Sequence, residues 1–543
     1  MDKTLKKFKI DKKVFEKFDD LMSKHLDTVE ELTVSCIETN SKYLNIISLF
    51  TNIKTIIIEG NSKTNVDSII LNICKPYELN NIILDGTKLP TKVAMKKLIN
   101  LKMISLNNIG YCDLKNFFDA IERPDKIRAI TLDNVCLSKN SINILNAFKS
   151  LEIINLIKIE NNSLRDLEFL LEDKELRKIN IENSVINFKD TNILLSGNYK
   201  KEILLTLPSS QNANISNSIE IDKNGEVSLT IDIADLDECL KYISLDKIDK
   251  LLLMINNRVQ IQNYISDLKN VKKSISITIK DVSYLDIEQA EILKENLKIK
   301  FVNILDFDGV LHYNGEKNCY LIDRYIKLRE CINSYISMVP AHCKEIEKFL
   351  EMYKILAENI TNDEFFEENI DNYNQVNAIK ATNLENGLIE KHCNSAGLAE
   401  ILKNCLACLD IEANIISGTY NNSEKENSWN QVKIDNMWYN TDLALDSKDL
   451  INKSILKKKA MYCLLNDKDF YSTHKRKSGR VNFCKYTVNR KAINSFFRTG
   501  VFSTKVTKAY LYCALSSLKK MIYVNKTKKL SAAKDEKKDW RGR

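Results

Sequence analysis

A six-residue pattern of apolar positions, apolar-x-x-apolar-x-apolar, recurs along the first 181 residues. Its occurrences are Val29-Leu32-Val34, Ile53-Ile56-Ile58, Leu79-Ile82-Leu84, Leu101-Ile104-Leu106, Ile127-Ile130-Leu132, Leu151-Ile154-Leu156 and Leu176-Ile179-Ile181. Successive occurrences start 24, 26, 22, 26, 24 and 25 residues apart. The alternation inside each occurrence is typical of a short strand with one buried face, and the steady period predicts stacked strand-and-return units.

These segments resemble leucine-rich repeats, in which each unit buries its apolar edge by stacking on its neighbours. They differ in one respect. Of the Asn or Cys that is usual three positions after the pattern, only Asn61 is present, which predicts irregular turns. The pattern weakens from about residue 200 to 305 but continues. The resemblance therefore implies an α/β leucine-rich-repeat solenoid over 29–305 that is irregular after about 200.

The residue after the last apolar position of each strand is expected on the open, concave face of this solenoid. These residues are Ser35, Glu59, Asp85, Asn107, Asp133, Ile157 and Glu182. Four of the seven are acidic, which is either the chance outcome of a charged composition or an acidic stripe that binds a basic partner. Glu59, Asp85, Asp133 and Glu182 are accordingly candidate binding residues.

The segment VNILDFDGVL at 302–311 matches a haloacid dehalogenase signature, in which one Asp attacks phosphorus and the next acts as acid and base. That fold needs a following α/β sheet with further ligands, and the residues after Leu311 predict helices instead. The alternative is a last repeat strand over 301–305 followed by a turn at Asp306 to Gly309, because Asp-x-Asp-Gly is ordinary turn chemistry.

Residues 320–360 have apolar positions at helical spacing and predict two helices interrupted near Pro340. The stretch KHCNSAGLAE at 391–400 then leads into a helix and a strand. The stretch NSWNQVKIDNMWYNTD at 427–442 predicts two strands joined at Asp435-Asn436, which is a hairpin signal.

Residues 315–475 resemble the transglutaminase-like superfamily, an α+β fold related to papain-type cysteine proteases. The matching framework is Gly397-Leu398-Ala399, then Ser428-Trp429-Asn430, then Trp438-Tyr439 and Asp442. The resemblance places the nucleophilic Cys at Ser395, the base His at Asn427 and the orienting Asp at Asp442. The sequence also departs from the family at Asp410, where Gly is usual, and at Ala444-Leu445, where Thr-Trp is usual.

A domain with these substitutions is expected to be catalytically degenerate. An Asn amide cannot accept a proton at neutral pH, so Asn427 cannot activate Ser395. Losing both groups should lower an acyl-transfer rate by roughly 10⁶-fold, and Asp442 would have no imidazole to orient. The alternative nucleophile is Cys393, beside His392. His474 could enter the site from outside the motif, but it is interpreted as a surface residue among basic neighbours. Trp429 and Trp438 are candidate binding residues of the cleft.

The composition adds limits to this interpretation. The 543 residues include 14 cysteines without a regular framework, which predicts reduced thiols and a cytoplasmic location, with signal-less export left open. No run approaches the roughly 18 apolar residues of a membrane helix, and no metal-ligand spacing is complete. From Lys505 to Arg543 there are 12 Lys and Arg against three acids, so the net charge of +8 lies in the tail and the body is nearly neutral.

The sequence thus predicts four segments: a helical cap at 1–28, the solenoid at 29–305, the transglutaminase-like domain at 315–475, and a helical extension with a basic tail at 476–543. The predicted function is that of a non-catalytic binding or scaffold protein for a protein or peptide partner, without cofactor, metal or specific nucleic acid. The alternatives are an active transglutaminase or thiol hydrolase that uses Cys393 or an unconventional site, and a purely structural protein. The sequence leaves the oligomeric state open.

Overall fold

The computed structural model describes most of the chain, and all structural statements below refer to that part. The described residues are 6–11, 26–35, 41–110, 114–135, 144–159, 168–173, 175–183, 188–197, 199–207, 209, 217–256, 258, 261–305, 319–362, 384–421, 426–451, 459–479 and 482–499. The turn predicted at Asp306 to Gly309 and the basic tail from Lys505 lie outside these residues.

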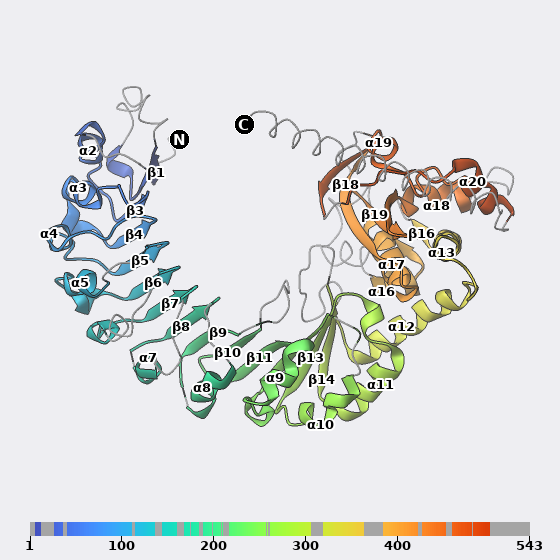
Figure 1. Ribbon diagram of the computed structural model, residues 1–543, viewed down its shortest axis with the longest axis horizontal. Coiled ribbons are helices and arrows are strands. Elements are labelled where there is room, and N and C mark those ends of the chain that lie inside the picture. The colour runs from blue at the N-terminus through green and yellow to red at the C-terminus, as the bar shows by residue number, and fades with distance from the viewer. Residues whose placement is uncertain are drawn as a thin grey trace, which may run out of the picture. The chain divides into compact units, whose positions relative to one another are not determined.

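A long, mostly parallel sheet of 15 strands runs through the structure, with each strand next to its neighbour in the sequence (Figure 1). Its strands are β1 (Lys7–Ile10), β2 (Glu31–Ser35), β3 (Thr55–Glu59), β4 (Asn81–Asp85), β5 (Met103–Asn107), β6 (Ala129–Asp133), β7 (Ile153–Ile157), β8 (Lys178–Glu182), β9 (Glu202–Thr206), β10 (Ser218–Ile221), β11 (Val227–Asp232), β12 (Lys250–Ile255), β13 (Ser274–Ile279), β14 (Ile299–Ile304) and β15 (Cys319–Tyr320). This arrangement is consistent with a solenoid-like α/β fold.

Short helices connect the strands and lie along one side of the sheet in Figure 1. They are α2 (Ser41–Ile47), α3 (Val66–Leu71), α4 (Lys92–Met95), α5 (Leu114–Asp119), α7 (Glu168–Glu172), α8 (Asn192–Ser196), α9 (Leu236–Leu240), α10 (Ile265–Leu268) and α11 (Ile287–Asn296).

The strands predicted from the seven apolar patterns are confirmed. From β2 to β8 the last two apolar positions of every pattern are buried inside a strand, as Ile82 and Leu84 are in β4. These positions pair in register with their counterparts in the next strand, so Ile82 lies opposite Ile56 on one side and Ile104 on the other. Stacking thus gives each strand a buried apolar row that a single unit could not provide.

The turn after each strand differs from the expected one. In five successive units the residue that follows the strand has a left-handed backbone: Gly86 (φ 66°), Asn108 (φ 52°), Asn134 (φ 53°), Lys158 (φ 50°) and Asn183 (φ 51°). Gly and Asn adopt this conformation at little steric cost. The backbone N–H of this residue donates to the next strand, as Asn108 does to the carbonyl of Asp133 at 2.8 Å. The Asn134 amide also donates to the Asn108 amide oxygen at 2.9 Å, which links neighbouring turns.

Two regions differ from a regular parallel stack. The sequence predicts a helical cap at residues 1–28, but Lys7–Ile10 form strand β1, which pairs in parallel with β2 and so continues the sheet at its first edge. After residue 200, β10 pairs antiparallel with both β9 and β11. The tight turn from β10 to β11 is closed by the Gly225 N–H donating to the Asp222 carbonyl.

The chain folds as two compact units, one formed by residues 1–254 and 266–275 and the other by 255–265 and 276–543. In the second unit the two helices predicted around Pro340 are present as α12 (Ile322–Ser337) and α13 (Glu345–Asn359). The remaining helices are α16 (Leu384–Ile389), α17 (Ser395–Cys408), α18 (Leu443–Ile451), α19 (Asp467–Phe470) and α20 (Arg490–Thr499).

The second unit also contains a four-stranded sheet, against which helix α17 packs. Its strands are β18 (Ala413–Tyr420), β19 (Glu426–Ile434), β20 (Met437–Thr441) and β21 (His474–Ser478), in the order β20-β19-β18-β21. The hairpin predicted at Asp435-Asn436 joins β19 to β20, and both turn residues have positive φ, as a two-residue hairpin requires. Helix α17 packs against β18 and β19, and a separate pair, β16 (Thr361–Asn362) and β17 (His392–Cys393), precedes it.

Candidate functional site

Ser395 is the first residue of helix α17, at the position where the sequence predicts the lost nucleophile. The Asn394 side chain caps this helix, because its oxygen accepts from the Gly397 N–H at 3.0 Å. The Ser395 side chain is buried, and its Oγ accepts from the backbone N–H of Ser428 on β19 at 3.3 Å. Helix α17 and strand β19 therefore meet at this hydroxyl.

Asp442 directly follows β20, is fully buried and accepts hydrogen bonds from three neighbouring residues. Its Oδ2 accepts from the Asn427 side-chain amide at 2.8 Å and from Nε2 of His474 at 3.2 Å. Its Oδ1 accepts from the Leu445 N–H at the start of α18 at 3.0 Å. Three donors thus converge on one carboxylate, and the two that belong to side chains are buried and would be costly to leave without partners.

The sequence interpretation of His474 as a surface residue is wrong. His474 is the first residue of β21, and its side chain is completely buried. The next three residues, all basic, are exposed. The imidazole stacks on the Phe470 ring, with centroids 3.8 Å apart and planes at 20°. Trp429, Tyr420 and Tyr462 surround it with ring centroids 5.1 to 5.3 Å away. The expectation that Asp442 orients no imidazole is therefore also wrong.

His474 is not arranged as a general base for Ser395. A carboxylate can only accept a hydrogen bond, so Nε2 carries a proton toward Asp442. The other ring nitrogen, Nδ1, lies 3.0 Å from Thr473 Oγ1 and 3.2 Å from the Phe470 carbonyl oxygen. Both ring nitrogens are therefore engaged by groups other than the serine. A triad base needs one nitrogen on the carboxylate and the other on the nucleophile.

Cys393, the alternative nucleophile, is completely buried in β17, whereas His392 beside it is exposed. Burial raises the pKa of the Cys393 thiol to about 12. The thiolate is the reactive form, so this thiol is almost entirely in its unreactive, protonated form at neutral pH.

The two candidate binding tryptophans differ in position. Trp429 is fully buried in a core cluster with Ile416, Leu465 and Phe470, so its indole does not face solvent. Trp438 is partly exposed, and the Lys433 ammonium lies 5.9 Å from its ring centroid. Of the two side chains, only Trp438 is accessible to a binding partner.

Asp410 occupies the end of helix α17, at a position where Gly was expected. Its backbone is left-handed, with φ 62°. The N–H groups of Asp410 and Ile411 donate to the carbonyls of Ala407 and Leu406, which is the Schellman arrangement that ends many helices. Asp tolerates this conformation better than most residues, and its carboxylate pairs with Arg258 at 2.7 Å. The departure from the expected Gly therefore leaves the helix end intact.

A second buried carboxyl, Asp446, lies one helical turn after Asp442. It accepts from the backbone N–H groups of Met461 and Tyr462 and from the hydroxyl of Tyr353 at 2.8 Å. Burial raises its pKa from an ordinary 3.8 to about 7; the hydrogen bonds from Tyr462 and Tyr353 oppose the rise, and the charge of Asp442 adds to it.

This raised pKa predicts a pH-dependent effect of Asp446→Asn. Between about pH 4 and pH 7 the folded state holds a proton on Asp446 that the unfolded chain has released, so this stabilisation is present at acidic pH and lost as the pH rises through about 7. Asn stays neutral throughout. The melting temperature of the wild type minus that of Asp446→Asn should therefore fall between about pH 5 and pH 8, as measured by circular dichroism. The exposed Asp323, replaced by Asn, is the control; a difference that does not change with pH would contradict the assignment.

The four candidate acids of the first unit lie in one row, as the sequence predicts. In the strand register Glu59 lies opposite Asp85, and Ile157 lies opposite Asp133 on one side and Glu182 on the other. Each of these residues is the last of its strand. The negative charge of the row is partly compensated, because Lys9 lies 2.7 Å from Glu59 and Lys158 lies 3.9 Å from Asp133. The Asn108 amide also donates to Asp85 at 2.8 Å. The hydrogen bonds from Lys9 and Ser35 lower the pKa of Glu59.

The described residues contain neither a cluster of metal-ligating side chains nor a membrane-spanning helix. No three His, Cys, Asp or Glu side chains there are grouped so that they could hold a metal ion. None of the helices in the described ranges is both long and apolar enough to cross a membrane.

Comparison with known proteins identifies no family. No family model and no curated protein matches the chain. Among solved structures, a protein described as a TGase is 18% identical over 23% of this chain and 33% of its own, with a TM-score of 0.21. Human 5T4 (trophoblast glycoprotein, Wnt-activated inhibitory factor 1) is 11% identical over 48% of this chain and 81% of its own, also with a TM-score of 0.21. Both likenesses are weak and partial, and the chain spans about a third of the TGase's length.

Proposed function

We propose that this chain is a non-catalytic binding or scaffold protein, in which a leucine-rich-repeat solenoid supplies a contact surface and a transglutaminase-like domain keeps the frame of a catalytic site without its chemistry. The proposed partner is a protein or peptide, and the proposed location is the cytoplasm. A basic partner would suit the row of Glu59, Asp85, Asp133 and Glu182, where the residual charge is negative.

The observation that carries this proposal is the hydrogen bonding of His474. A base that could replace the missing histidine is present in the second unit, but its Nε2 donates to Asp442 and its Nδ1 faces Thr473 and Phe470. The amide of Asn427 occupies the remaining side of the same carboxylate oxygen. Hydrogen bonds that would orient a base in a working triad instead cross-link β19, β20 and β21.

The alternative function is that of a transglutaminase or thiol hydrolase that uses Cys393. This alternative needs a thiolate that a substrate can reach. The complete burial of Cys393 and its raised pKa both oppose that requirement, and its neighbour His392 lies on the exposed side of the strand.

Site-resolved labelling of the full-length protein separates the two functions. We expect a fluorophosphonate probe to leave Ser395 unmodified, because no base activates its hydroxyl. We also expect iodoacetamide at about pH 7 to modify Cys393 far more slowly than Cys74, which is exposed and serves as an internal reference. Mass spectrometry of tryptic peptides gives both rates. Labelling of Ser395, or of Cys393 at least as fast as Cys74, would support the enzyme instead.

A further inference from the structure

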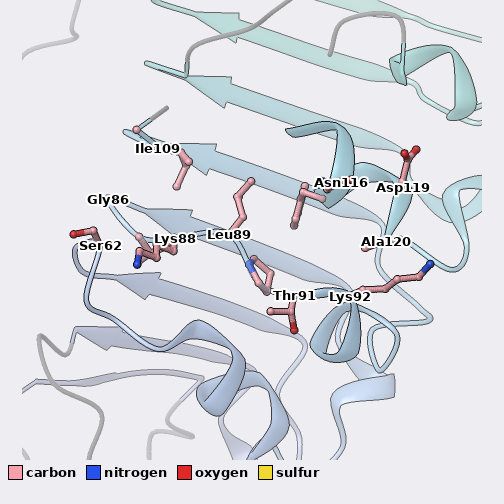
Figure 2. Close-up of a pocket in the computed structure, with 14 residues that line it drawn as sticks. Ser62, Gly86, Lys88, Leu89, Thr91, Lys92, Ile109, Asn116, Asp119 and Ala120 are labelled. Atoms are coloured by element: carbon pink, nitrogen blue, oxygen red, sulfur yellow. The ribbon is translucent and has the colours of Figure 1, made fainter. Parts of the chain in front are cut away.

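The shortest strand-and-helix repeat of the first compact unit has a pocket beside it. Only 22 residues separate the starts of the patterns at Leu79 and Leu101, against 24 to 26 elsewhere. The segment that connects β4 to β5 in this repeat contains only the four-residue helix α4, which lies between the longer helices α3 and α5 in the sequence. A pocket of about 930 Å³ opens there, formed by the loops after β3, β4 and β5 and by the first residues of α4 and the body of α5 (Figure 2). This volume lies within the range of ligand sites.

The wall of the pocket is apolar in its middle and charged at its ends. Leu89 lies near the centre in Figure 2, and Pro90, Ile109, Phe117 and Ala120 also line the pocket. Lys88 lies at one end, beside Ser62, and Lys92 extends toward the other end, where Asp119 and Ala120 lie.

Several polar groups of the pocket have no protein partner. The Thr87 side chain is only 4% exposed, and its Oγ1 makes no hydrogen bond with the described residues. This hydroxyl oxygen is sealed from solvent, so it lies behind the pocket wall and is not a group that a ligand contacts. The side-chain ammonium groups of Lys88 and Lys92 are exposed and make no hydrogen bond or ion pair with another described residue, so both are available.

From this arrangement we propose that the pocket binds an extended acidic peptide of a partner protein, with one apolar side chain seated on Leu89 and a carboxylate paired with Lys88. A second carboxylate pairs with Lys92 more weakly, because Asp119 shares that end of the pocket. Charge complementarity selects the acidic peptide, since the charged residues that line the pocket are two lysines and one aspartate. This inference rests on the proposed binding function and names one of its sites.

The test uses two bead-displayed octapeptide libraries with a central Leu, Ile or Phe, flanked by Asp and Glu in one and by Lys and Arg in the other. We expect the fluorescently labelled full-length protein to be retained at least about tenfold more by the acidic library. Lys88→Glu should lower that retention by about fivefold, as expected for an accessible ion pair that is reversed. The matched control is Lys97→Glu, because Lys97 is an exposed lysine just after α4 that does not line the pocket. This variant should retain the wild-type level of binding to the acidic library.

A filling variant tests the location independently of charge. A Cβ added at Gly110 meets no atom within 4 Å, and the backbone there is not left-handed, so Gly110→Leu should narrow the pocket without disturbing the fold. We expect it to lower retention while the melting temperature stays unchanged. Equal retention by both libraries, or retention at the wild-type level by Lys88→Glu or by a folded Gly110→Leu, would each overturn the site. The labelling rates of Ser395 and Cys393 are a separate readout, so failure here leaves the non-catalytic proposal standing.

Discussion

Asp442→Ala should lower the free energy of unfolding by about 3 kcal/mol or more, the largest stability effect that we expect from a single polar substitution. Alanine would leave three donors without this acceptor: the buried Asn427 amide, the buried His474 Nε2–H and the partly buried Leu445 N–H. The substitution also removes the unfavourable free energy of burying the carboxylate, which offsets part of this destabilisation.

Urea unfolding followed by tryptophan fluorescence measures this effect, since Trp429 lies in the same core and its ring centroid is 5.1 Å from that of His474. The matched control is Asp323→Ala, because Asp323 is 65% exposed in its ion pair with Lys294 and its loss should cost less than about 1 kcal/mol. If Asp442→Ala cost no more than this control, the three donors would have other partners. The network would then not be structural.

The stacked strands could be predicted from the sequence because their signal is repeated. Each pattern places two buried residues two positions apart, and seven copies at nearly constant spacing distinguish strands from helices. The turns were harder to predict, because the family position, three residues after the pattern, holds buried Ile109 and Val135 here. The left-handed residues lie one position earlier, at Asn108 and Asn134. A search for Asn or Gly directly after each strand would have found them.

The position of His474 could not be predicted by the same reasoning. Burial of this side chain depends on the pairing of β21 with β18, where His474 lies opposite Tyr420. That pairing joins segments more than 50 residues apart, and the neighbouring Lys475, Arg476 and Lys477 give the local sequence the character of a surface strand. The one local signal was the aromatic pair Phe470-Tyr471 a turn earlier, which indicates an apolar environment. Ser395, Asn427 and Asp442 carried a motif and were therefore found, whereas a residue that joins the site from outside the motif carries none.

The double variant Ser395→Cys with Asn427→His should have a reactive thiol that neither change produces alone. The Asn427 amide already donates to Asp442 Oδ2 at 2.8 Å, so an imidazole at position 427 can make the same hydrogen bond with one nitrogen. Its other nitrogen is then available to the thiol at position 395, at the beginning of helix α17, where the helix dipole also favours an anion. His474 keeps its own hydrogen bond to the same oxygen, since a carboxylate oxygen can accept two donors.

The size of the effect follows from thiolate chemistry. An ordinary thiol with a pKa of about 8.5 is less than about 1% ionised at pH 6, whereas a thiol paired with imidazole, with a pKa of about 6.5, is roughly one quarter ionised. The lower basicity reduces the intrinsic nucleophilicity by about eightfold, which leaves a net gain of about tenfold. The rate of iodoacetamide alkylation at about pH 6, resolved by peptide mass spectrometry, should therefore be about tenfold higher in the double variant than in Ser395→Cys.

The matched control is Ser395→Cys with Asn427→Gln, which lengthens the side chain but supplies no basic nitrogen. Poor access to position 395, where the serine is only 4% exposed, slows all three variants alike and cancels in the comparison. The Gln control should react no faster than Ser395→Cys alone. If the double variant also reacted no faster, an imidazole at position 427 would not reach the thiol. The assignment of Asn427 to the base position, and with it the account of this domain as a catalytic frame without its reactive groups, would then fail.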